Sequence, residues 1–561
     1  MFNKLIKFLF LIIIIYQTPV YSKSASFNEI NARDLTNYFS GIVAFENQEN
    51  SEALKFFNSS KILINKHNLF IKRYIYSLVL DNKVSQAINV IKNVSDNGSI
   101  EFFDAYLLLV IDSLKKNNFI NAEKYLKNAI RFNEYGRFNP IITGILKDFV
   151  QTFIQKKIIL NKVNFGNISL ISQAFQRCYL QKDNTRSSFL NLINYPSGDY
   201  SRYKFFYANY LIQNKKYNDA KAVFKDIQYI SSTLLLSQSK SWIDKKEYKN
   251  FTKIFSCNNH NDIVSEFLFL ISSLYSSEDD LNKSNFYSNL SFYLNPKFKF
   301  NLALIIENYY SNNQYEKFKN VLKNFDKNDE FYYWFKLKKE AQIIIKKKDE
   351  DYGIDFITSK FNKIENPNIK IIFDIANFYK NSKKYEKAIE HYSQIISMLD
   401  EQIDIKSDLL YRRGSSYERL KNFKKSDEDL LNAMKIRPND AYVLNYLAYS
   451  WLERGYKIDE AIQMLKKAYS IQNDDPYIID SIGWAYYLIN DYLEAEKYLK
   501  RAVELMPDDP IVNDHYGDIL WSLNRKLQAR YFWRNVLSFE DADEDIKKKI
   551  KTKLIEGLKK S

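Results

Sequence analysis

Glycine, proline and histidine are scarce in this chain. Its 561 residues include only 12 Gly, 9 Pro and 4 His, and there are 2 Cys. Glycine and proline supply most turns, bulges and phosphate-binding loops. Their scarcity argues against a turn-rich fold and predicts that most residues lie in helices, while a hydrophobic content of 46% is enough for continuous burial.

Motifs of known catalytic sites are missing as well. The chain has no GxSxG nucleophile turn, no P-loop and no GxGxxG dinucleotide-binding loop. The histidines are scattered without the HExxH spacing of a zinc site: His67, His260, His391 and His515. We therefore expect no catalytic residue, no metal and no cofactor.

The positive charge of the chain does not form a nucleic-acid footprint. The formal net charge is +15, from 82 Lys and Arg against 67 Asp and Glu. No arginine-rich arm is present, and basic and acidic residues alternate as they do on solvated helix faces. We predict no binding of nucleic acid.

The first residues, MFNKLIKFLFLIIIIYQTPVYSKS, have the layout of a signal peptide. Lys4 and Lys7 precede an apolar run from residue 8 to 16, and small residues permit cleavage after Ser22. The run is about half the ~20 residues that span a bilayer. We expect residues 1–22 to be removed and the mature chain to be periplasmic, without a transmembrane span; an uncleaved anchor in the inner membrane is the alternative. No cysteine stands beside the cleavage site, which argues against lipoprotein processing.

A pattern of small and large apolar residues recurs at intervals close to 34 residues. One copy consists of Gly483, Tyr486, Ala495 at +12, Leu499 at +16, Ala502 at +19 and Pro507 at +24. The next copy consists of Gly517, Leu520, Ala529, Trp533 and Val536. Other copies begin at Gly41, Ile75, Val110, Ala208, Ser239, Ser272, Ile306, Ala341, Ala376, Gly414 and Ala448. The register blurs between residues 133 and 200, and about fifteen copies tile the chain.

Each copy predicts a pair of helices that stacks on the next pair. Apolar residues recur every three or four positions on both sides of a polar break, such as KNNF, QNKKY, NNQY, KNSKKY or INDY. Asn in these breaks tolerates the left-handed conformation that ends a helix. Gly or Ala permits close helix contact, and the large residue at +16 fills the space between pairs. Such tiling leaves no segment of ~100 residues for a catalytic domain.

This pattern resembles the tetratricopeptide repeat (TPR), whose consensus has Gly or Ala, Tyr, Ala, Phe, Ala and Pro at the positions of Gly483, Tyr486, Ala495, Leu499, Ala502 and Pro507. The resemblance implies an all-α solenoid of helical hairpins, a right-handed superhelix of about fourteen to fifteen repeats. The C-terminal copies resemble bacterial cell-envelope TPR proteins, including a lipoprotein adaptor of a periplasmic carboxyl-terminal processing protease. This chain lacks the lipidated cysteine of that adaptor.

The pattern also predicts how the chain is subdivided. We expect a signal peptide at 1–22, TPR-like repeats at 34–136, degenerate hairpins at 137–200, degenerate repeats at 201–368, a well-preserved array at 369–543 and a basic helix or tail at 544–561.

In TPR proteins the first helix of each repeat lines the concave surface. Transferred to the C-terminal copies, this face presents Tyr411, Tyr442, Asn445, Tyr449, Tyr477, Asp480, Trp484, Tyr487, Asp514, Asp518 and Trp521. Chaperone adaptors of the family hold a peptide carboxylate with Lys and Asn at this face, which the residues here do not reproduce. Aromatic and acidic residues suit a peptide or helix with apolar and basic contacts instead.

Three groups of residues allow more than one interpretation. Trp484 and Tyr487 lie off the packing positions and either face the groove or pack on the neighbouring repeat, whereas Tyr486 is expected in the core. His515 with Asp514 and Asp518 could resemble a metal site, but we expect a solvated or groove-facing polar patch. Cys178 and Cys257 fall in separated repeats, so two buried free thiols are favoured over a disulfide.

The sequence thus predicts a scaffold or adaptor without chemistry of its own, which binds a protein or peptide in its concave groove. A periplasmic processing protease or a peptidoglycan enzyme is a candidate partner. Two alternatives remain: a purely architectural protein of an envelope complex, and an enzyme with an unrecognised site in residues 137–200. The oligomeric state does not follow from the sequence.

Overall fold

The chain folds into helices that stack in pairs. The computed structural model describes residues 32–64, 67–95, 101–160, 163–399, 404–540 and 542–558. Within them all regular secondary structure is helical, which confirms the all-α prediction. None of these described helices combines the length and the hydropathy that a membrane span requires. The predicted signal peptide lies outside the described residues.

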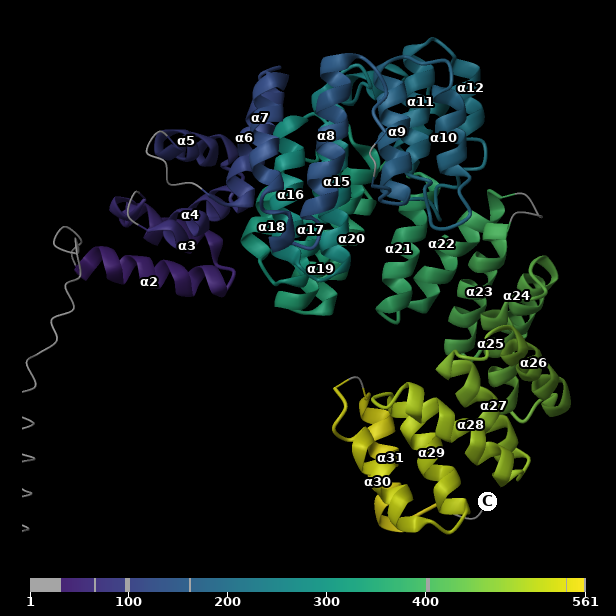
Figure 1. Cartoon of the computed structure of the whole chain (residues 1–561). Helices are drawn as coiled ribbons and strands as arrows, with labels where there is room; N and C mark the ends of the chain where they lie inside the picture. The colour runs from purple at the N-terminus through teal and green to yellow at the C-terminus, as the bar shows by residue number, and fades with distance from the viewer. Residues whose placement is uncertain are drawn as a thin grey trace, which may run out of the picture. The chain divides into compact units, whose positions relative to one another are not determined.

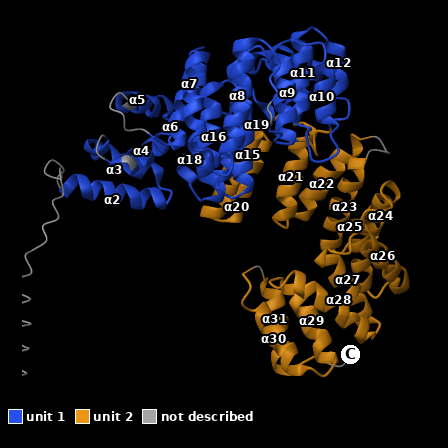
Figure 2. Cartoon of the chain, viewed as in Figure 1, with its two compact units in different colours: residues 1–227, 233–333 blue, residues 228–232, 334–561 orange. Residues whose placement is uncertain are grey.

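Two compact units divide the chain, as the colours of Figure 2 show. Unit 1 comprises residues 1–227 and 233–333, and unit 2 comprises residues 228–232 and 334–561. The helices of unit 1 are α2 (Ala32–Glu46), α3 (Asn50–Ser59), η2 (Lys61–Leu63), α4 (Asn68–Leu80), α5 (Val84–Ser95), α6 (Phe103–Lys115), α7 (Phe119–Ile130), η3 (Asn133–Tyr135), α8 (Asn139–Gln155), α9 (Asn167–Tyr179), α10 (Thr185–Ile193), α11 (Tyr203–Gln213), α12 (Tyr217–Val223), α13 (Leu234–Asp244), α14 (Lys249–Ile254), α15 (His260–Ser277), α16 (Leu281–Leu294), η4 (Lys299–Asn301), α17 (Leu302–Ser311) and α18 (Tyr315–Leu322).

Unit 2 begins within a helix, because α19 (Glu330–Lys347) crosses the division. It continues with α20 (Glu350–Phe361), α21 (Ile369–Asn381), α22 (Tyr385–Ser397), α23 (Asp404–Arg419), α24 (Phe423–Ile436), α25 (Ala441–Glu453), α26 (Ile458–Ile471), α27 (Pro476–Leu488), α28 (Tyr492–Leu505), α29 (Pro510–Ser522), α30 (Lys526–Val536) and α31 (Glu544–Glu556). Lys370 joins the short segment 228–232 to this unit, since its Nζ donates to the carbonyls of Tyr229, Ile230 and Ser232.

Most of the described hairpin turns share one backbone geometry. Asn117, Asn313 and Asn490 adopt positive φ at the polar breaks, as predicted. In the breaks QNKKY and KNSKKY, however, the left-handed residue is Lys215 or Lys383 rather than Asn. The amide after the turn residue then donates back to the carbonyl five residues earlier, as from Asp491 to Tyr486. The turn therefore demands the conformation, and Lys is tolerated there at a strain of about 1–2 kcal/mol.

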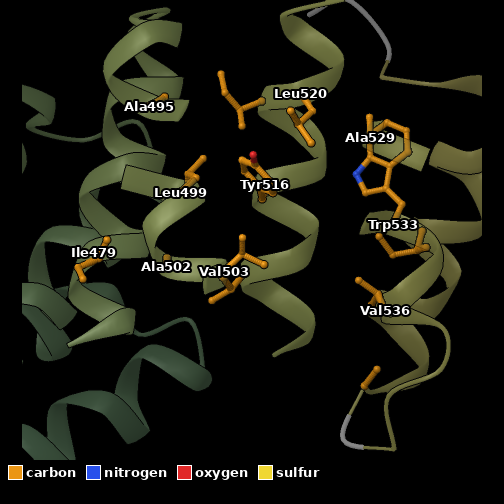
Figure 3. Close-up of a cluster of buried hydrophobic side chains, with 14 residues drawn as sticks. Ile479, Ala495, Leu499, Ala502, Val503, Tyr516, Leu520, Ala529, Trp533 and Val536 are labelled. Atoms are coloured by element: carbon orange, nitrogen blue, oxygen red, sulfur yellow. The ribbon is translucent and has the colours of Figure 1, made fainter. Parts of the chain in front are cut away.

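The small residues of the pattern lie where two helices of a hairpin touch. A Cβ atom added at Gly483 would lie 2.7 Å from Cγ of Leu499, and one at Gly517 would lie 2.4 Å from Cδ1 of Trp533. Both partners stand 16 positions later, the place of the large apolar residue in each copy. Figure 3 shows Leu499 and Trp533 within one cluster of buried side chains. The spacing of the pattern is thus explained by packing.

Tyr486 is only half-buried, although the pattern predicts it in the core. Its ring stacks on that of Tyr498 at a centroid distance of 5.7 Å and packs against the buried clusters of two neighbouring hairpins. It contributes to the packing between repeats from the edge of the core.

Helices far apart in sequence pack together within unit 1. Helix α16 contacts α4 and α6, and α15 contacts α8, as Figure 1 shows. Polar side chains hold these contacts: Nδ2 of Asn289 donates to the carbonyl of Val79 at 2.9 Å, and Nε2 of His260 lies 2.9 Å from the carbonyl oxygen of Leu114. Unit 1 is therefore stabilised by contacts between helices far apart in sequence as well as by the stacking of neighbouring hairpins.

The two cysteines form a disulfide, so the expectation of free thiols is wrong. Cys178, at the end of α9, and Cys257, in the turn before α15, have Cα atoms 5.6 Å apart, and both are fully buried. Helices α9 and α15 are in contact, although 79 residues separate the two cysteines. The repeat spacing predicted that the two cysteines lie far apart, because it carries no information on contacts between non-neighbouring helices.

Residues 137–200, where the register blurs, contain α8, α9 and α10. Over the described part of the chain, no group of His, Cys, Asp and Glu side chains is arranged to hold a metal ion.

A candidate protein-binding groove in unit 2

Identical caps give α25, α27 and α29 the same register. Asp440, Asp475 and Asp509 each precede one of these helices, and each side chain accepts hydrogen bonds from the backbone amides two and three positions later. Pro476 and Pro510 occupy the first helical positions, where no amide is needed. Residues at matching positions of the three helices thus share one face.

The predicted aromatic residues lie at different depths on this face. Tyr442 and Tyr477, at matching positions of α25 and α27, are each 52% exposed. Tyr411 and Tyr449 are half-buried, and the ring of Tyr411 meets that of Tyr446 edge to face at 5.5 Å. Tyr442 and Tyr477 are therefore the aromatic rings that a partner can reach most directly.

Trp484 forms a stack with its neighbours and is half-buried. Its ring lies 4.0 Å from that of His515 and 4.7 Å from that of Tyr487, both nearly parallel. Its Nε1 donates to Oε1 of Glu453 at 2.8 Å. The stack spans α25, α27 and α29, so Trp484 and Tyr487 combine partial exposure with packing between repeats.

The acidic residues belong to a buried network. Asp480 lies 2.8 Å from Nδ1 of His515, and Nζ of Lys553 on α31 donates to Asp514 at 2.5 Å and to Asp518 at 2.7 Å. His515, Asp514 and Asp518 are all less than one-tenth exposed. Asp514, His515 and Asp518 line the groove and are buried rather than solvated.

Burial and neighbouring charges both act on the pKa values of this network. Burial lowers the pKa of His515, but the carboxylates of Asp480, Asp514 and Asp518 outweigh it, and the pKa is raised. Burial raises the pKa of Asp518 to about 6, and Asp514 adds to the rise while Lys553 and His515 oppose it. Proton binding to the groove therefore varies near neutral pH.

Trp521 lies under the C-terminal helix α31 and is half-buried. A Cβ atom at Gly557 would lie 2.1 Å from the Trp521 ring, so the backbone there packs directly on the indole. Arg530 lies 5.0 Å from the centre of the same ring. The segment predicted as a basic helix or tail contains the packed helix α31, in which Ile550 is buried. Its signal in the sequence was an Asp543 cap followed by apolar residues at intervals of four.

A groove of about 960 Å³ lies between the first half of α31 and the face of α25, α27 and α29. It brings together Tyr449, Tyr477, Trp484, Asp514 and Asp518 of the predicted residues. Six predicted residues do not line it: Tyr442, Asn445, Asp480, Tyr487 and Trp521, which lie on the same helices, and Tyr411, which lies on α23. Glu453, Asp508, Asp545, Lys549 and Lys553 line it and were not predicted.

Comparison with known proteins agrees with the spacing and the hairpins. The family model of the tetratricopeptide repeat matches residues 369–398, 407–440 and 478–509. The chain contains tetratricopeptide repeats. All three matches lie in unit 2 and cover the hairpins α21–α22, α23–α24 and α27–α28.

Known relatives match parts of the chain. A TPR repeat-containing protein of Pseudomonas aeruginosa is 30% identical over 123 residues, which are 22% of this chain and 20% of that protein. The chain thus matches about a fifth of that relative's length. Among solved structures, a tetratricopeptide repeat protein from Parabacteroides merdae is 16% identical over 51% of this chain and 97% of its own, with a TM-score of 0.36. A TPR protein of Thermus thermophilus is 17% identical over 34% and 100%, with a TM-score of 0.30.

Proposed function

We propose that this chain is an exported scaffold that binds a partner protein or peptide segment on the concave face of its C-terminal repeats. TPRs are protein-binding modules, and their fold is typically non-catalytic. The observation that carries the proposal is the groove of unit 2, where the exposed Tyr477, a stacked tryptophan and carboxylates share one face. Such aromatic rings are frequent hot spots of protein interfaces.

Export is supported by the disulfide between Cys178 and Cys257. Disulfides persist in oxidising compartments such as the bacterial periplasm and are rare in the cytosol. The expected cleavage after Ser22 agrees with this compartment. Sequencing the amino terminus of the purified protein tests it: the expected first residue is Lys23, and an intact Met1 on a cytoplasmic protein contradicts it.

A cell-envelope complex is the proposed setting of this scaffold, with a peptidoglycan enzyme or a carboxyl-terminal processing protease as partner. The resemblance of the C-terminal repeats to envelope TPR proteins supports it. Affinity purification of the mature chain followed by mass spectrometry of the bound proteins identifies the partner.

The groove is tested by replacing Tyr477, which lines it, together with Tyr442, the exposed ring at the matching position of α25. Tyr442→Ala with Tyr477→Ala removes surface that does not support the core, so the fold is expected to survive. We expect the affinity for the partner to fall at least about tenfold, as it does when interface hot spots are removed. The matched control is Tyr352→Ala with Tyr531→Ala, two exposed tyrosines of unit 2 outside the groove. Equal capture by both variants contradicts the groove, and several partners that ignore it favour the architectural alternative.

A further inference from the structure

The groove of unit 2 has a charge opposite to that of the whole chain. The chain carries a formal charge of +15. In the groove, carboxylates outnumber the two lysines, Lys549 and Lys553. Glu453, Asp508 and Asp545 are exposed on its rim, and among the described residues no basic side chain forms an ion pair with them. An acidic groove on a basic protein selects for cationic partners.

Lys553 shows how this face binds a cation. Its ammonium group lies between Asp514 and Asp518, which stand one helical turn apart on α29. Three contacts between 2.5 and 2.8 Å hold it, and its side chain is 17% exposed. The surrounding carboxylates raise the pKa of Lys553 in spite of its burial. A lysine that enters this face from another segment is thus stable and charged in the folded chain.

The preceding repeats offer acceptors without such a lysine. Asp480 on α27 matches Asp514 on α29, and Asn445 matches them on α25. Asp480 is 5% exposed, and only its Oδ2 is bonded, to His515, while its Oδ1 has no hydrogen-bond partner. Oδ1 of Asn445 is likewise buried and unbonded. Unsatisfied buried acceptors favour the approach of donors or positive charge.

The aromatic residues beside these acceptors are already in place. Trp484 is fixed by its stack on His515 and by its hydrogen bond to Glu453. Tyr477 also lines the groove and is 52% exposed, and the aliphatic stem of a lysine or arginine packs well on such an exposed ring, whose face attracts the charge. A preordered ring reduces the entropy lost on binding.

We infer that the groove binds an extended, lysine- or arginine-containing segment of the partner protein, laid across α25, α27 and α29. A cationic side chain packs on the exposed ring of Tyr477 and faces the rim carboxylates. Helix axes about 8–10 Å apart give a span of about 20 Å, which corresponds to about six extended residues. This inference names the chemistry of the partner and rests on the proposed protein-binding function.

A peptide of defined charge tests the inference on the full mature chain. The probe is a fluorescein-labelled decapeptide of alternating lysine and valine, and its counterpart has glutamate in place of lysine. Fluorescence anisotropy is expected to show binding of the lysine peptide alone, weakened by added salt. Glu453→Gln with Asp545→Asn is expected to reduce the affinity at least about tenfold, as removal of interfacial charges does.

The matched control is Glu428→Gln with Asp459→Asn. It removes the same number and kind of carboxylates from exposed positions outside the groove, and Asp459, like Asp545, lies in the first turn of a helix. The control is expected to bind within about twofold of the original chain. Equal loss in both variants, or equal binding of the glutamate peptide, overturns the inference.

The same variants separate this inference from the function on which it rests. If the natural partner requires Tyr442 and Tyr477 but binds normally to Glu453→Gln with Asp545→Asn, the groove function stands and the cationic segment is wrong. If sedimentation shows instead a dimer of this chain that the same variant dissociates, the occupant is a second copy, and the inference of a separate partner is wrong.

Discussion

Unit 1 and unit 2 consist of the same helical hairpins but are stabilised over different distances. In unit 1, the disulfide joins residues 79 positions apart in the sequence, and the hydrogen bond from Asn289 to Val79 joins residues 210 positions apart. In unit 2, the ion pairs that join different helices link adjacent hairpins or the two helices of one hairpin, as do Arg454 with Asp427 and Arg413 with Asp429. Where the repeat pattern is sharp, contacts between neighbouring hairpins predominate, although Lys370 of α21 also bonds to the distant segment 228–232. Where the pattern is degenerate, long-range polar contacts supplement those between neighbours.

Removal of the disulfide is expected to show the largest difference between the two units. Cys178→Ala with Cys257→Ala releases a cross-link across 79 residues, and the free energy of unfolding of unit 1 should fall by about 2–5 kcal/mol. Hydrogen exchange should show faster exchange in α8, α9 and α15, with α27 to α29 unchanged. A reductant should have the same effect on the original chain and none on the variant. Uniform loss of protection in both units contradicts this separation.

A second variant tests local packing in unit 2. Gly517→Ala places a Cβ atom 2.4 Å from the buried Trp533 ring, and overpacking of this kind should lower the free energy of unfolding by about 1–3 kcal/mol. Gly414→Ala is the graded control, because its nearest atoms lie at 3.1 Å and belong to Asp429 and Leu430. Urea denaturation should rank Gly517→Ala below Gly414→Ala. The reverse order would show that these glycines do not act through the contact at +16.

Replacing Asn289 tests whether the stability of unit 1 depends on single polar contacts between distant helices. Asn289→Ala leaves the carbonyl of Val79 without this donor, which should lower the free energy of unfolding by about 1–3 kcal/mol. Exchange should rise in both α4 and α16, although they are far apart in sequence. The exposed Asn320→Ala on α18 serves as control and should change neither helix. A rise confined to α16 would mean that the contact does not couple the two.

These results indicate which features were predictable from sequence. The contact between Gly483 and Leu499 follows from periodicity alone, because both residues belong to one hairpin. The Cys178–Cys257 pair does not, since repeat spacing carries no information on contacts between distant helices. Lys215 occupies a turn predicted for Asn because the backbone geometry tolerates several residue types.

The groove was predictable to a similar extent. Matching positions on α25, α27 and α29 placed Tyr449, Tyr477 and Trp484 on one face. The insertion of Lys553 between Asp514 and Asp518 was not foreseen, because it comes from a segment outside the repeat pattern.

The smallest expected effect is the pH dependence of unit 2. The pKa of His515 is raised in the folded chain by Asp480, Asp514 and Asp518 in spite of burial. Folded unit 2 therefore binds this proton more tightly than the unfolded chain, whose histidine pKa is about 6.5. Its stabilisation is complete below pH ~6.5 and is lost as the pH rises through the raised pKa.

Urea denaturation between pH 6 and 8.5 measures this loss. His515→Gln should flatten the decline in that range, and so should Asp480→Asn, which removes the first carboxylate that raises the pKa. Glu453 and Lys553 also line this part of the groove and stay unchanged in both variants. An undiminished decline in His515→Gln would assign it to another group.

Site-specific crosslinking tests the functional difference between the units most directly. A photoreactive phenylalanine at Tyr477 in unit 2 and one at Tyr217 in unit 1 replace tyrosines that are 52% and 42% exposed. In cells, the residue at position 477 should crosslink to one main partner, and Tyr442→Ala should abolish that product. Crosslinks to the partner from position 217 alone would contradict the assignment of binding to the groove of unit 2.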